Sequence, residues 1–237
     1  MNLKSNLMIT YESNQKRLDN FLTCKDLLSQ DLSLFSAIDT VNHFSFYKKI
    51  ALENNLISKD WIQKIESTNL NINPAKKGKG SIGCDLSHIF LWLNIIYSSA
   101  QDSDIFMILE DDVGFELEFL KEVDICKSCM KRTGSHFLTF YCHPNFHREQ
   151  FSVNNFVKKD IYKMIPQWGT VGYLISKKGC KNLINFLPMD DPVDIFIGSL
   201  VSQLYALTLK TNNFYTLGAK DANDKDSAFG SIIWNNV

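Results

Sequence analysis

The sequence predicts an α/β protein with a largely parallel central sheet flanked by helices, and two observations carry this prediction. Apolar runs of strand length alternate along the chain with longer segments of helical periodicity, the order that produces parallel strands with helical connections. In addition, the run at 105–109 is apolar at every position, as expected of a strand covered on both faces. With 45% hydrophobic residues in a chain of 237, one large core can form, and we find no internal repeat or low-complexity linker.

The order of elements follows from the positions of apolar runs, helical segments and Gly- or Pro-rich stretches. In the first half we expect a strand at 7–11, a helix capped by Ser13, a strand at 32–39 ending at Asp39, a helix in two pieces over 44–64, an exposed mobile loop at 71–83 and a helix at 84–97. In the second half we expect a strand at 105–109, a helix at 115–132, strands at 136–142 and 169–176, a helix over 176–187, a loop opening into a helix over 190–204 and a strand at 205–211. The tail from Gly218 is polar and predicts no defined element.

The charge of the chain restricts its partners. A formal net charge of −1 offers no overall attraction to nucleic acid or acidic membranes, so we expect a small molecule or a neutral glycan as partner. The first residues lack a basic segment followed by an apolar run of signal-peptide length, and no window approaches the roughly 20 apolar residues of a membrane span. We therefore expect a cytoplasmic protein without a transmembrane segment, with peripheral contact at the inner face of the cytoplasmic membrane left open.

The cysteines include a pattern that resembles a zinc finger. Cys126, Cys129, His143 and His147 have the spacing of a two-Cys, two-His finger. Pro144, however, lies between the histidines, where a finger requires a helix, and the segment with the cysteines has helical periodicity instead of a knuckle. We interpret the spacing as chance and expect all six cysteines to be reduced thiols.

Three consecutive carboxylates, Glu110, Asp111 and Asp112, follow the apolar run at 105–109. In open α/β sheets, ligands bind beyond the carboxyl ends of the strands. Extended geometry directs Glu110 and Asp112 to one side and Asp111 to the other, and a pair of hard oxygen ligands suits Mg²⁺ or Mn²⁺ together with a diphosphate. The alternative is an acidic strand end that hydrates a turn and favours the next helix, and the triplet alone leaves both open.

Neighbouring motifs favour the first interpretation. The segment "GKGSIGCDLSHIFLW" followed by "ILEDDV" resembles glycosyltransferase family 25, the lipooligosaccharide and collagen galactosyltransferases, in which G-x-I-G-C-x-L-S-H precedes L-E-D-D. Weaker similarity surrounds Arg17, the segments "FSAID" and "GTVGYLISKKGCKNLI", and Asp194. The chain departs from the family pattern at four positions: Thr10 in place of Asn, Thr40 in place of Gly, and Cys180 and Asp85 in small-residue positions.

The resemblance implies a GT-A-type nucleotide-sugar-binding sandwich, forming a single domain over 1–237 with a nucleotide-sugar half near 1–115 and an acceptor half near 116–237. It implies an inverting enzyme with a UDP-sugar donor and Mn²⁺ or Mg²⁺. The expected reaction moves a hexose, galactose or glucose, to a lipid-linked glycan acceptor such as bacterial lipooligosaccharide. Two alternatives stay open: a catalytically inactive interaction protein, and a transferase acting on a protein acceptor such as hydroxylysine.

The resemblance also assigns expected roles to the acidic strand end. Asp112 is the principal metal ligand, and Glu110 is a second ligand or a contact to the donor sugar or ribose. Asp111 is expected among the catalytic residues, where it holds the donor or orients its neighbours. Arg17 contacts the nucleotide, with an ordinary solvated helix arginine as the alternative.

Further expected roles fall on the helix before the acidic strand and on a later loop. Gly80 and Gly83 allow close backbone approach to the donor, although turn geometry alone could require them. His88 hydrogen-bonds a metal-binding carboxylate without touching the metal itself, or is simply a buried, hydrogen-bonded histidine. Asp194 is the candidate general base for the acceptor hydroxyl, with Asp190 and Asp191 as alternatives and a helix N-cap as its structural alternative.

Overall fold

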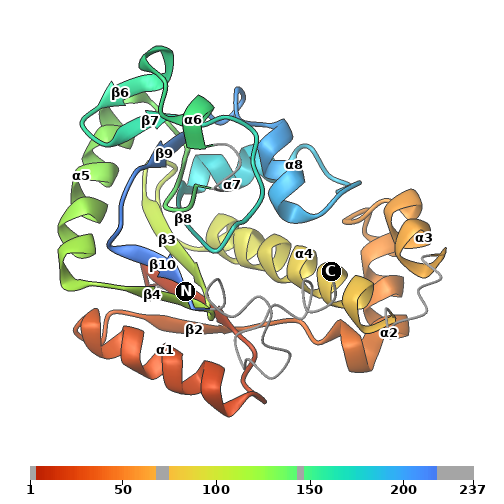
Figure 1. Ribbon diagram of the computed structural model, residues 1–237. Coiled ribbons are helices and arrows are strands. Elements are labelled where there is room, and N and C mark those ends of the chain that lie inside the picture. Colours follow the sequence, from red (N-terminus) through yellow and green to blue (C-terminus); the bar gives the residue numbers. More distant parts are fainter. Residues whose placement is uncertain (1–3, 68–74, 143–146, 218–237) are drawn as a thin grey trace.

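The computed structural model describes residues 4–67, 75–142 and 147–217 (Figure 1). Its strands are β1 (Asn6–Thr10), β2 (Ser33–Ser36), β3 (Ile105–Glu110), β4 (Val113–Phe115), β5 (Phe137–Thr139), β6 (Phe156–Lys158), β7 (Ile161–Lys163), β8 (Gly172–Ser176), β9 (Leu207–Leu209) and β10 (Phe214–Thr216). Its helices are α1 (Gln15–Leu27), α2 (Thr40–Glu53), α3 (Lys59–Ser67), α4 (Ala75–Tyr97), α5 (Leu117–Thr133), α6 (His147–Gln150), α7 (Lys177–Ile184) and α8 (Val193–Ser199), with a short 3₁₀ helix, η2, at Val153–Asn155. The alternation of strands and helices confirms the α/β class.

The central sheet contains eight strands in the order β2-β1-β3-β8-β5-β9-β7-β6. Strand β1 pairs in parallel with β2 and β3, and β5 pairs in parallel with β9. Strand β8 runs antiparallel between β3 and β5, and β7 runs antiparallel between β9 and β6. Most strands therefore share one direction, as expected, but the sheet is mixed because β7 and β8 are reversed.

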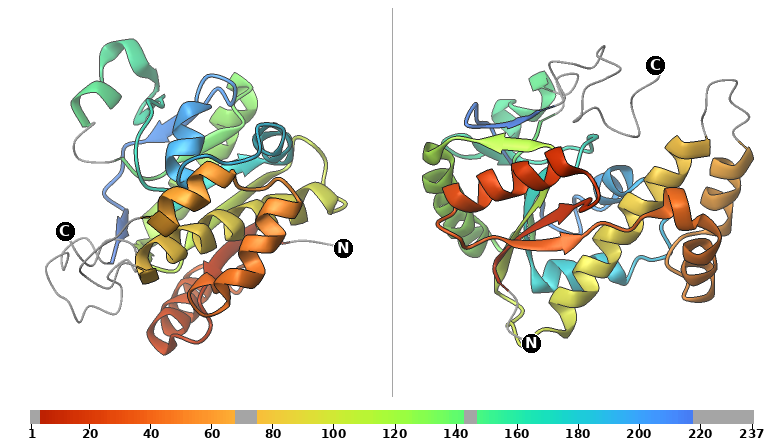
Figure 2. Two further views of the ribbon diagram at one scale, coloured as in Figure 1. Left: turned by 90° about the vertical axis from the view of Figure 1, so that its right-hand side faces the viewer. Right: turned by 90° about the horizontal axis from the view of Figure 1, so that it is seen from below.

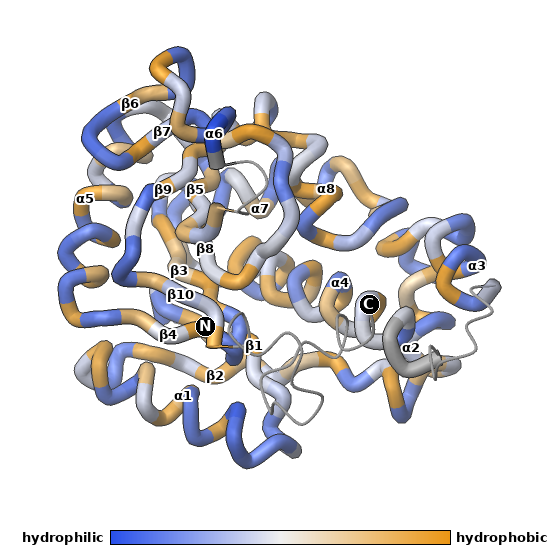
Figure 3. Tube along the Cα trace, viewed as in Figure 1, coloured by the Kyte–Doolittle hydropathy of each residue, from blue (hydrophilic) through white to orange (hydrophobic). Residues whose placement is uncertain are grey.

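Two apolar cores cover the two faces of this sheet. Helices α2, α3, α4, α7 and α8 pack on one face, and α1 and α5 pack on the other (Figures 1 and 2). In β3, Phe106 and Ile108 belong to the first core, whereas Met107 and Leu109 belong to the second. This confirms that the apolar run is a strand buried on both faces, and Figure 3 shows the central strands as predominantly hydrophobic.

A small second sheet brings the end of the described chain to the acidic triplet. Strand β10 pairs antiparallel with β4, which follows Asp112 directly. The amide of Leu217 donates a 2.7 Å hydrogen bond to the carbonyl of Asp112. The backbone immediately after β3 is therefore held by a segment about a hundred residues further along the chain.

Several predicted boundaries were wrong, and each has a local reason. The cap of α1 is Asn14, whose side chain accepts the amide of Arg17 at 3.3 Å, and not Ser13. Strand β2 ends at Ser36, and Asp39 instead caps α2 by accepting the amide of Asn42 at 3.1 Å.

The predicted mobile loop at 71–83 was wrong from Ala75 onward, because these residues form the first turns of α4; residues 71–74 lie outside the described part of the chain. A Cβ atom on Gly83 would lie 2.6 Å from the carbonyl oxygen of Ile38 and 2.6 Å from Oγ1 of Thr40. Glycine therefore allows α4 to approach the connection between β2 and α2. Packing of this helix outweighs the roughly 1 kcal/mol by which each glycine disfavours a helix interior.

The segment that carries Cys126 and Cys129 is helical, as predicted. Cys126 and Cys129 lie on α5 with no exposed surface and contribute to the core between α5 and the sheet. All six cysteines are free thiols. His143 lies outside the described residues, as does the tail from Gly218. Within the described ranges, no helix combines the length and apolar character that a membrane crossing requires.

Candidate active site

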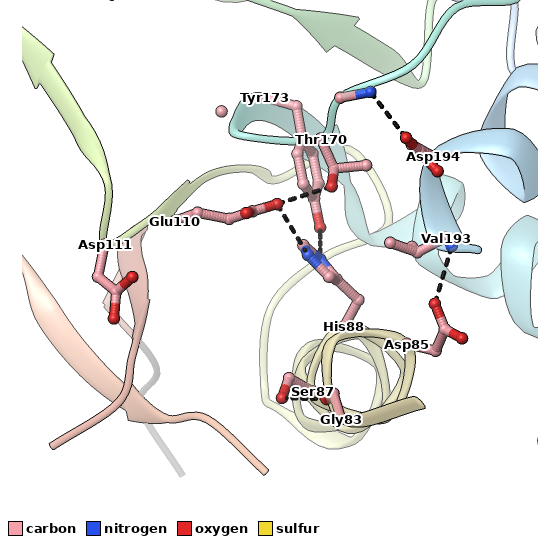
Figure 4. Close-up of polar contacts among 12 residues, drawn as sticks. Gly83, Asp85, Ser87, His88, Glu110, Asp111, Thr170, Tyr173, Val193 and Asp194 are labelled. Carbon is pink, nitrogen blue, oxygen red and sulfur yellow. Dashed lines mark hydrogen bonds and ion pairs between the residues drawn. The ribbon is translucent and has the colours of Figure 1, made fainter. Parts of the chain in front are cut away.

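The carboxyl ends of β1, β2 and β3 meet α4 around a cavity of about 400 Å³, a size typical of small-molecule sites. Seven residues nominated from the sequence line it together: Arg17, Gly80, Gly83, His88, Glu110, Asp111 and Asp112. Asp194, which was also nominated, is not among the described residues that line this cavity. Figure 4 shows Thr170 between Asp194 and Glu110. The fold thus gathers most of the predicted site from three separate stretches of sequence.

Asp111 fastens the turn after β1 to the end of β3. Its Oδ1 accepts a hydrogen bond from the Arg17 guanidinium, and its Oδ2 accepts the amide of Tyr11 at 2.8 Å. The side chain of Asn20 adds bonds to the backbone carbonyls of Asp111 and Val113 at 3.1 and 2.8 Å. Burial raises the pKa of Asp111, and Arg17 offsets only part of this rise. Both carboxylate oxygens are therefore engaged within the protein, which is the geometry of an orienting residue.

Asp112 is the least satisfied carboxylate of the triplet. Its Oδ1 atom is buried and has no hydrogen-bond partner. Burial, followed by the charge of Glu110, raises the pKa of Asp112 to about 7. An unpartnered buried carboxylate oxygen is costly unless a cation or donor meets it. The oxygen chemistry of Asp112 and Glu110 in one cavity therefore fits a hard divalent cation.

Glu110 is held by two neighbours from different elements (Figure 4). Thr170 donates its hydroxyl to Oε1 at 2.7 Å, and Nε2 of His88 lies 3.5 Å from the same oxygen. Burial acts to raise the pKa of Glu110, but His88, Thr170 and Arg17 outweigh it and leave the pKa below its ordinary value. Glu110 is accordingly ionised at neutral pH.

His88 belongs to a buried polar chain that sequence reasoning had not found. Its Nδ1 lies 2.8 Å from the hydroxyl of Tyr173, and the indole of Trp92 donates to that hydroxyl at 3.0 Å. All three side chains are fully buried. His88 lies inside α4 instead of near a helix start, and its contact with Glu110 agrees with the expected support of a carboxylate. Thr170 and Tyr173 both lie in the family-like segment "GTVGYLIS", and this segment was the sequence signal that could have indicated these contacts.

Ser87 joins α4 to the segment after β2. Its hydroxyl donates to the carbonyl of Gly83 at 2.6 Å and accepts the amide of Ile38 at 2.8 Å. Together with the close approach at Gly83, these bonds fix the wall of the cavity formed by residues 37–41.

Asp194 lies in the first turn of α8, whose N-cap is Pro192. Its Oδ2 accepts the amide of Gly169 at 2.9 Å, and its Oδ1 accepts the amide of Ile195 at 2.9 Å. The N-cap alternative for Asp194 was therefore wrong. Of the other two candidates, Asp190 is exposed and Asp191 lies 3.6 Å from the ammonium group of Lys64.

Asp85, the departure from the family pattern on α4, has a structural explanation. It is 1% exposed and accepts the Trp61 indole at 3.0 Å and the amide of Val193 at 2.8 Å. Burial raises the pKa of Asp85 to about 7 despite these bonds. Asp85 thus connects α4 to α3 and to the start of α8, the helix that carries Asp194.

A mixed α/β sheet with ionisable side chains gathered around a cavity at its strand ends is typical of a small-molecule binding site. The model of glycosyltransferase family 25 (LPS biosynthesis protein) matches residues 3–197. The chain therefore belongs to glycosyltransferase family 25.

Three curated relatives agree with this assignment. A "Glycosyltransferase 25 family member" of Aedes aegypti is 30% identical over 122 residues, 50% of this chain and 19% of the relative. A "Putative glycosyltransferase" of Haemophilus influenzae is 32% identical over 131 residues, 54% of this chain and 43% of the relative. A "Glycosyltransferase 25 family member" of Anopheles gambiae is 24% identical over 195 residues, 80% of this chain and 30% of the relative. The chain spans less than half the length of each.

Proposed function

We propose that this chain is an inverting, metal-dependent hexosyltransferase of the GT-A type. In this proposal it moves galactose or glucose from a UDP-sugar to a glycan acceptor. The observation that carries the proposal is a pair of buried atoms without hydrogen-bond partners, on two residues that line one cavity: Oδ1 of Asp112, an anionic acceptor, and Nε of Arg17, a cationic donor. A metal-bound diphosphate supplies a cation for the first and an anion for the second.

Asp112 and Glu110 are the residues that would hold Mn²⁺ or Mg²⁺. When bound there, the ion supplies Lewis-acid stabilisation of the departing nucleoside diphosphate. Asp111 keeps Arg17 at the cavity through their ion pair. Gly80 and Gly83 line the cavity, and Gly83 lets α4 approach Ile38 and Thr40, which form part of its wall.

The acceptor side of the proposal depends on Asp194. An inverting transfer needs a base opposite the leaving group, and Asp194 lies beyond Thr170 from Glu110 (Figure 4). Each of its oxygens accepts one backbone amide, so each retains a lone pair for the acceptor hydroxyl. Asp194 would accept the hydroxyl proton as the new glycosidic bond forms.

The association of family 25 with LPS biosynthesis supports a lipid-linked glycan as acceptor. We place the reaction at the cytoplasmic face of the membrane, with residues 1–115 binding the donor and 116–237 contributing to acceptor binding. The alternatives, a protein acceptor or an inactive interaction protein, are outcomes of the test below.

Isothermal calorimetry with UDP tests the donor site directly. We expect tight binding with Mn²⁺ and much weaker binding with a chelator, followed by transfer from UDP-galactose or UDP-glucose to a truncated lipooligosaccharide. Metal-dependent UDP binding without transfer to any glycan would favour the protein-acceptor or inactive alternatives. Equal UDP affinity with and without Mn²⁺ would contradict the metal site.

A further inference from the structure

Cys84, His88 and Glu110 form a second set of potential metal ligands in the cavity. A ligand atom from each, sulfur, nitrogen and oxygen, lies within 4.8 Å of the other two. Cys84 and His88 are four residues apart on α4 and therefore lie on one face of that helix. Figure 4 shows His88 directed from α4 towards Glu110 at the end of β3.

The separation of His88 and Glu110 fits two ligands of one ion better than a hydrogen bond. His88 has no exposed surface, and its Nε2 has no hydrogen-bond partner. Nε2 lies 3.5 Å from Oε1 of Glu110, whereas a charge-assisted hydrogen bond would bring the two atoms to about 2.7–2.9 Å. Two ligands bound to one tetrahedral Zn²⁺ at about 2.0–2.2 Å are separated by roughly 3.4 Å.

The other nitrogen of His88 already has the support that ligating histidines require. Nδ1 lies 2.8 Å from the hydroxyl oxygen of Tyr173, to which Trp92 also donates. With Nε2 on a metal, Nδ1 carries the proton and donates it to this oxygen, whose two lone pairs accept both bonds. Such a bond fixes the ring orientation of most metal-binding histidines.

We infer that Cys84, His88 and Glu110 form a Zn²⁺ site that shares Glu110 with the hard-cation site proposed at Asp112. A thiolate and an imidazole select zinc over Mg²⁺ or Mn²⁺. Three protein ligands leave the fourth tetrahedral position open to the cavity. As the Cys84 sulfur binds the ion, its thiol proton is released to solvent.

One consequence, unlike the site itself, rests on the proposed function. Zn²⁺ at this position occupies Glu110 and the adjacent part of the cavity. We therefore expect micromolar zinc to weaken UDP binding in the presence of Mn²⁺.

The site is tested by metal binding without donor or acceptor. Metal-stripped protein, kept reduced with a phosphine, is first titrated with Cd²⁺, whose binding to a thiolate produces an ultraviolet charge-transfer absorption band. A second sample is titrated with Zn²⁺ in a calorimeter. We expect one equivalent of Cd²⁺ to saturate the band. Cys84→Ser should abolish the band and weaken Zn²⁺ binding by at least about tenfold, whereas the matched control Cys126→Ser, a buried thiol on α5, should retain both.

Glu110→Gln provides a second variant should Cys84→Ser not fold, as judged by circular dichroism. It should retain the thiolate band and weaken Zn²⁺ binding by at least about tenfold. The inference would be overturned by absence of the band in the wild type, or by its persistence in folded Cys84→Ser. Loss of the band in Cys126→Ser, or unchanged Zn²⁺ affinity in Glu110→Gln, would also overturn it. Failure of sugar transfer or of Mn²⁺-dependent UDP binding would refute the proposed function while leaving these metal titrations decisive.

Discussion

The hydroxyl of Thr170 donates a 2.7 Å hydrogen bond to Glu110, tying the loop before β8 to the end of β3. The amide of the preceding residue, Gly169, donates a 2.9 Å bond to Asp194. One dipeptide therefore contacts both the carboxylate proposed to hold the cation and the carboxylate proposed as general base (Figure 4). The relative placement of donor and acceptor chemistry in our proposal depends on this short segment.

Asp112→Asn should abolish the metal dependence of UDP binding. The substitution keeps the side-chain shape but removes the charge, and Lewis-acid stabilisation is worth several kcal/mol, so transfer should fall by about 10²-fold or more. Calorimetry with Mn²⁺ and with chelator measures the binding, and Asp104→Asn, just before β3 at its opposite end, is the control. A folded Asp112→Asn protein with wild-type Mn²⁺-dependent UDP affinity would exclude this ligand.

Asp194→Asn should reduce turnover by about 10²- to 10⁴-fold, the usual contribution of a general base, while UDP affinity stays unchanged. The asparagine oxygen can still accept the amide of Gly169, so the loop should keep its position. Asp191→Asn, on the same segment but paired with Lys64, should remain close to wild type. Normal turnover of Asp194→Asn with a true acceptor would assign the base elsewhere.

Asp85 should make the protein less stable as the pH rises. Its pKa in the folded state is about 7, above the roughly 3.9 of an unfolded aspartate. Between these two values the folded state binds more protons than the unfolded state, so the free energy of unfolding falls with increasing pH. The stabilisation is complete below the unfolded pKa and is lost once the pH passes about 7.

Urea unfolding at pH 5 and pH 8, with metal absent, measures this effect. Asp85→Asn keeps one oxygen, which can accept either Trp61 or Val193, and cannot ionise. We expect the decrease in unfolding free energy between these pH values to be smaller in the variant by about 2–3 kcal/mol. An identical decrease in both proteins would show that Asp85 does not titrate in this range.

Gly83→Ala should destabilise the protein by about 1–3 kcal/mol, the usual cost of overpacking. The new methyl group would meet the carbonyl of Ile38 and the hydroxyl of Thr40, each at 2.6 Å. Gly198→Ala on α8 is the matched control, because its nearest neighbours lie at 3.6 Å. Thermal unfolding should separate the two variants; equal stability would mean that α4 can move away from the β2–α2 connection without cost.

The sequence by itself determined the α/β class, the buried strand at 105–109 and seven of the residues around the cavity. These features depend on patterns within short stretches: an apolar run followed directly by Glu110, Asp111 and Asp112, and helical spacing that places Cys84 and His88 on one face. Local periodicity records such features because neighbouring residues share one strand or helix. Family membership followed from the same short motifs.

The tertiary structure decided which distant side chains meet. Asp111 pairs with Arg17 across 94 positions, and Glu110 meets Thr170 across 60. Only the folded packing shows that both oxygens of Asp111 are engaged while one of Asp112 is not.

Strand direction and the start of α4 were also decided by packing. The apolar run of β8 is the same whether its neighbours run parallel or antiparallel, so the reversed strand between β3 and β5 could not be read from its residues. The glycines and lysines of residues 75–83 predict a loop by local propensity, yet they form the start of α4. Contacts with α2 and α7 stabilise this helix through long-range burial, a contribution that local propensity does not contain.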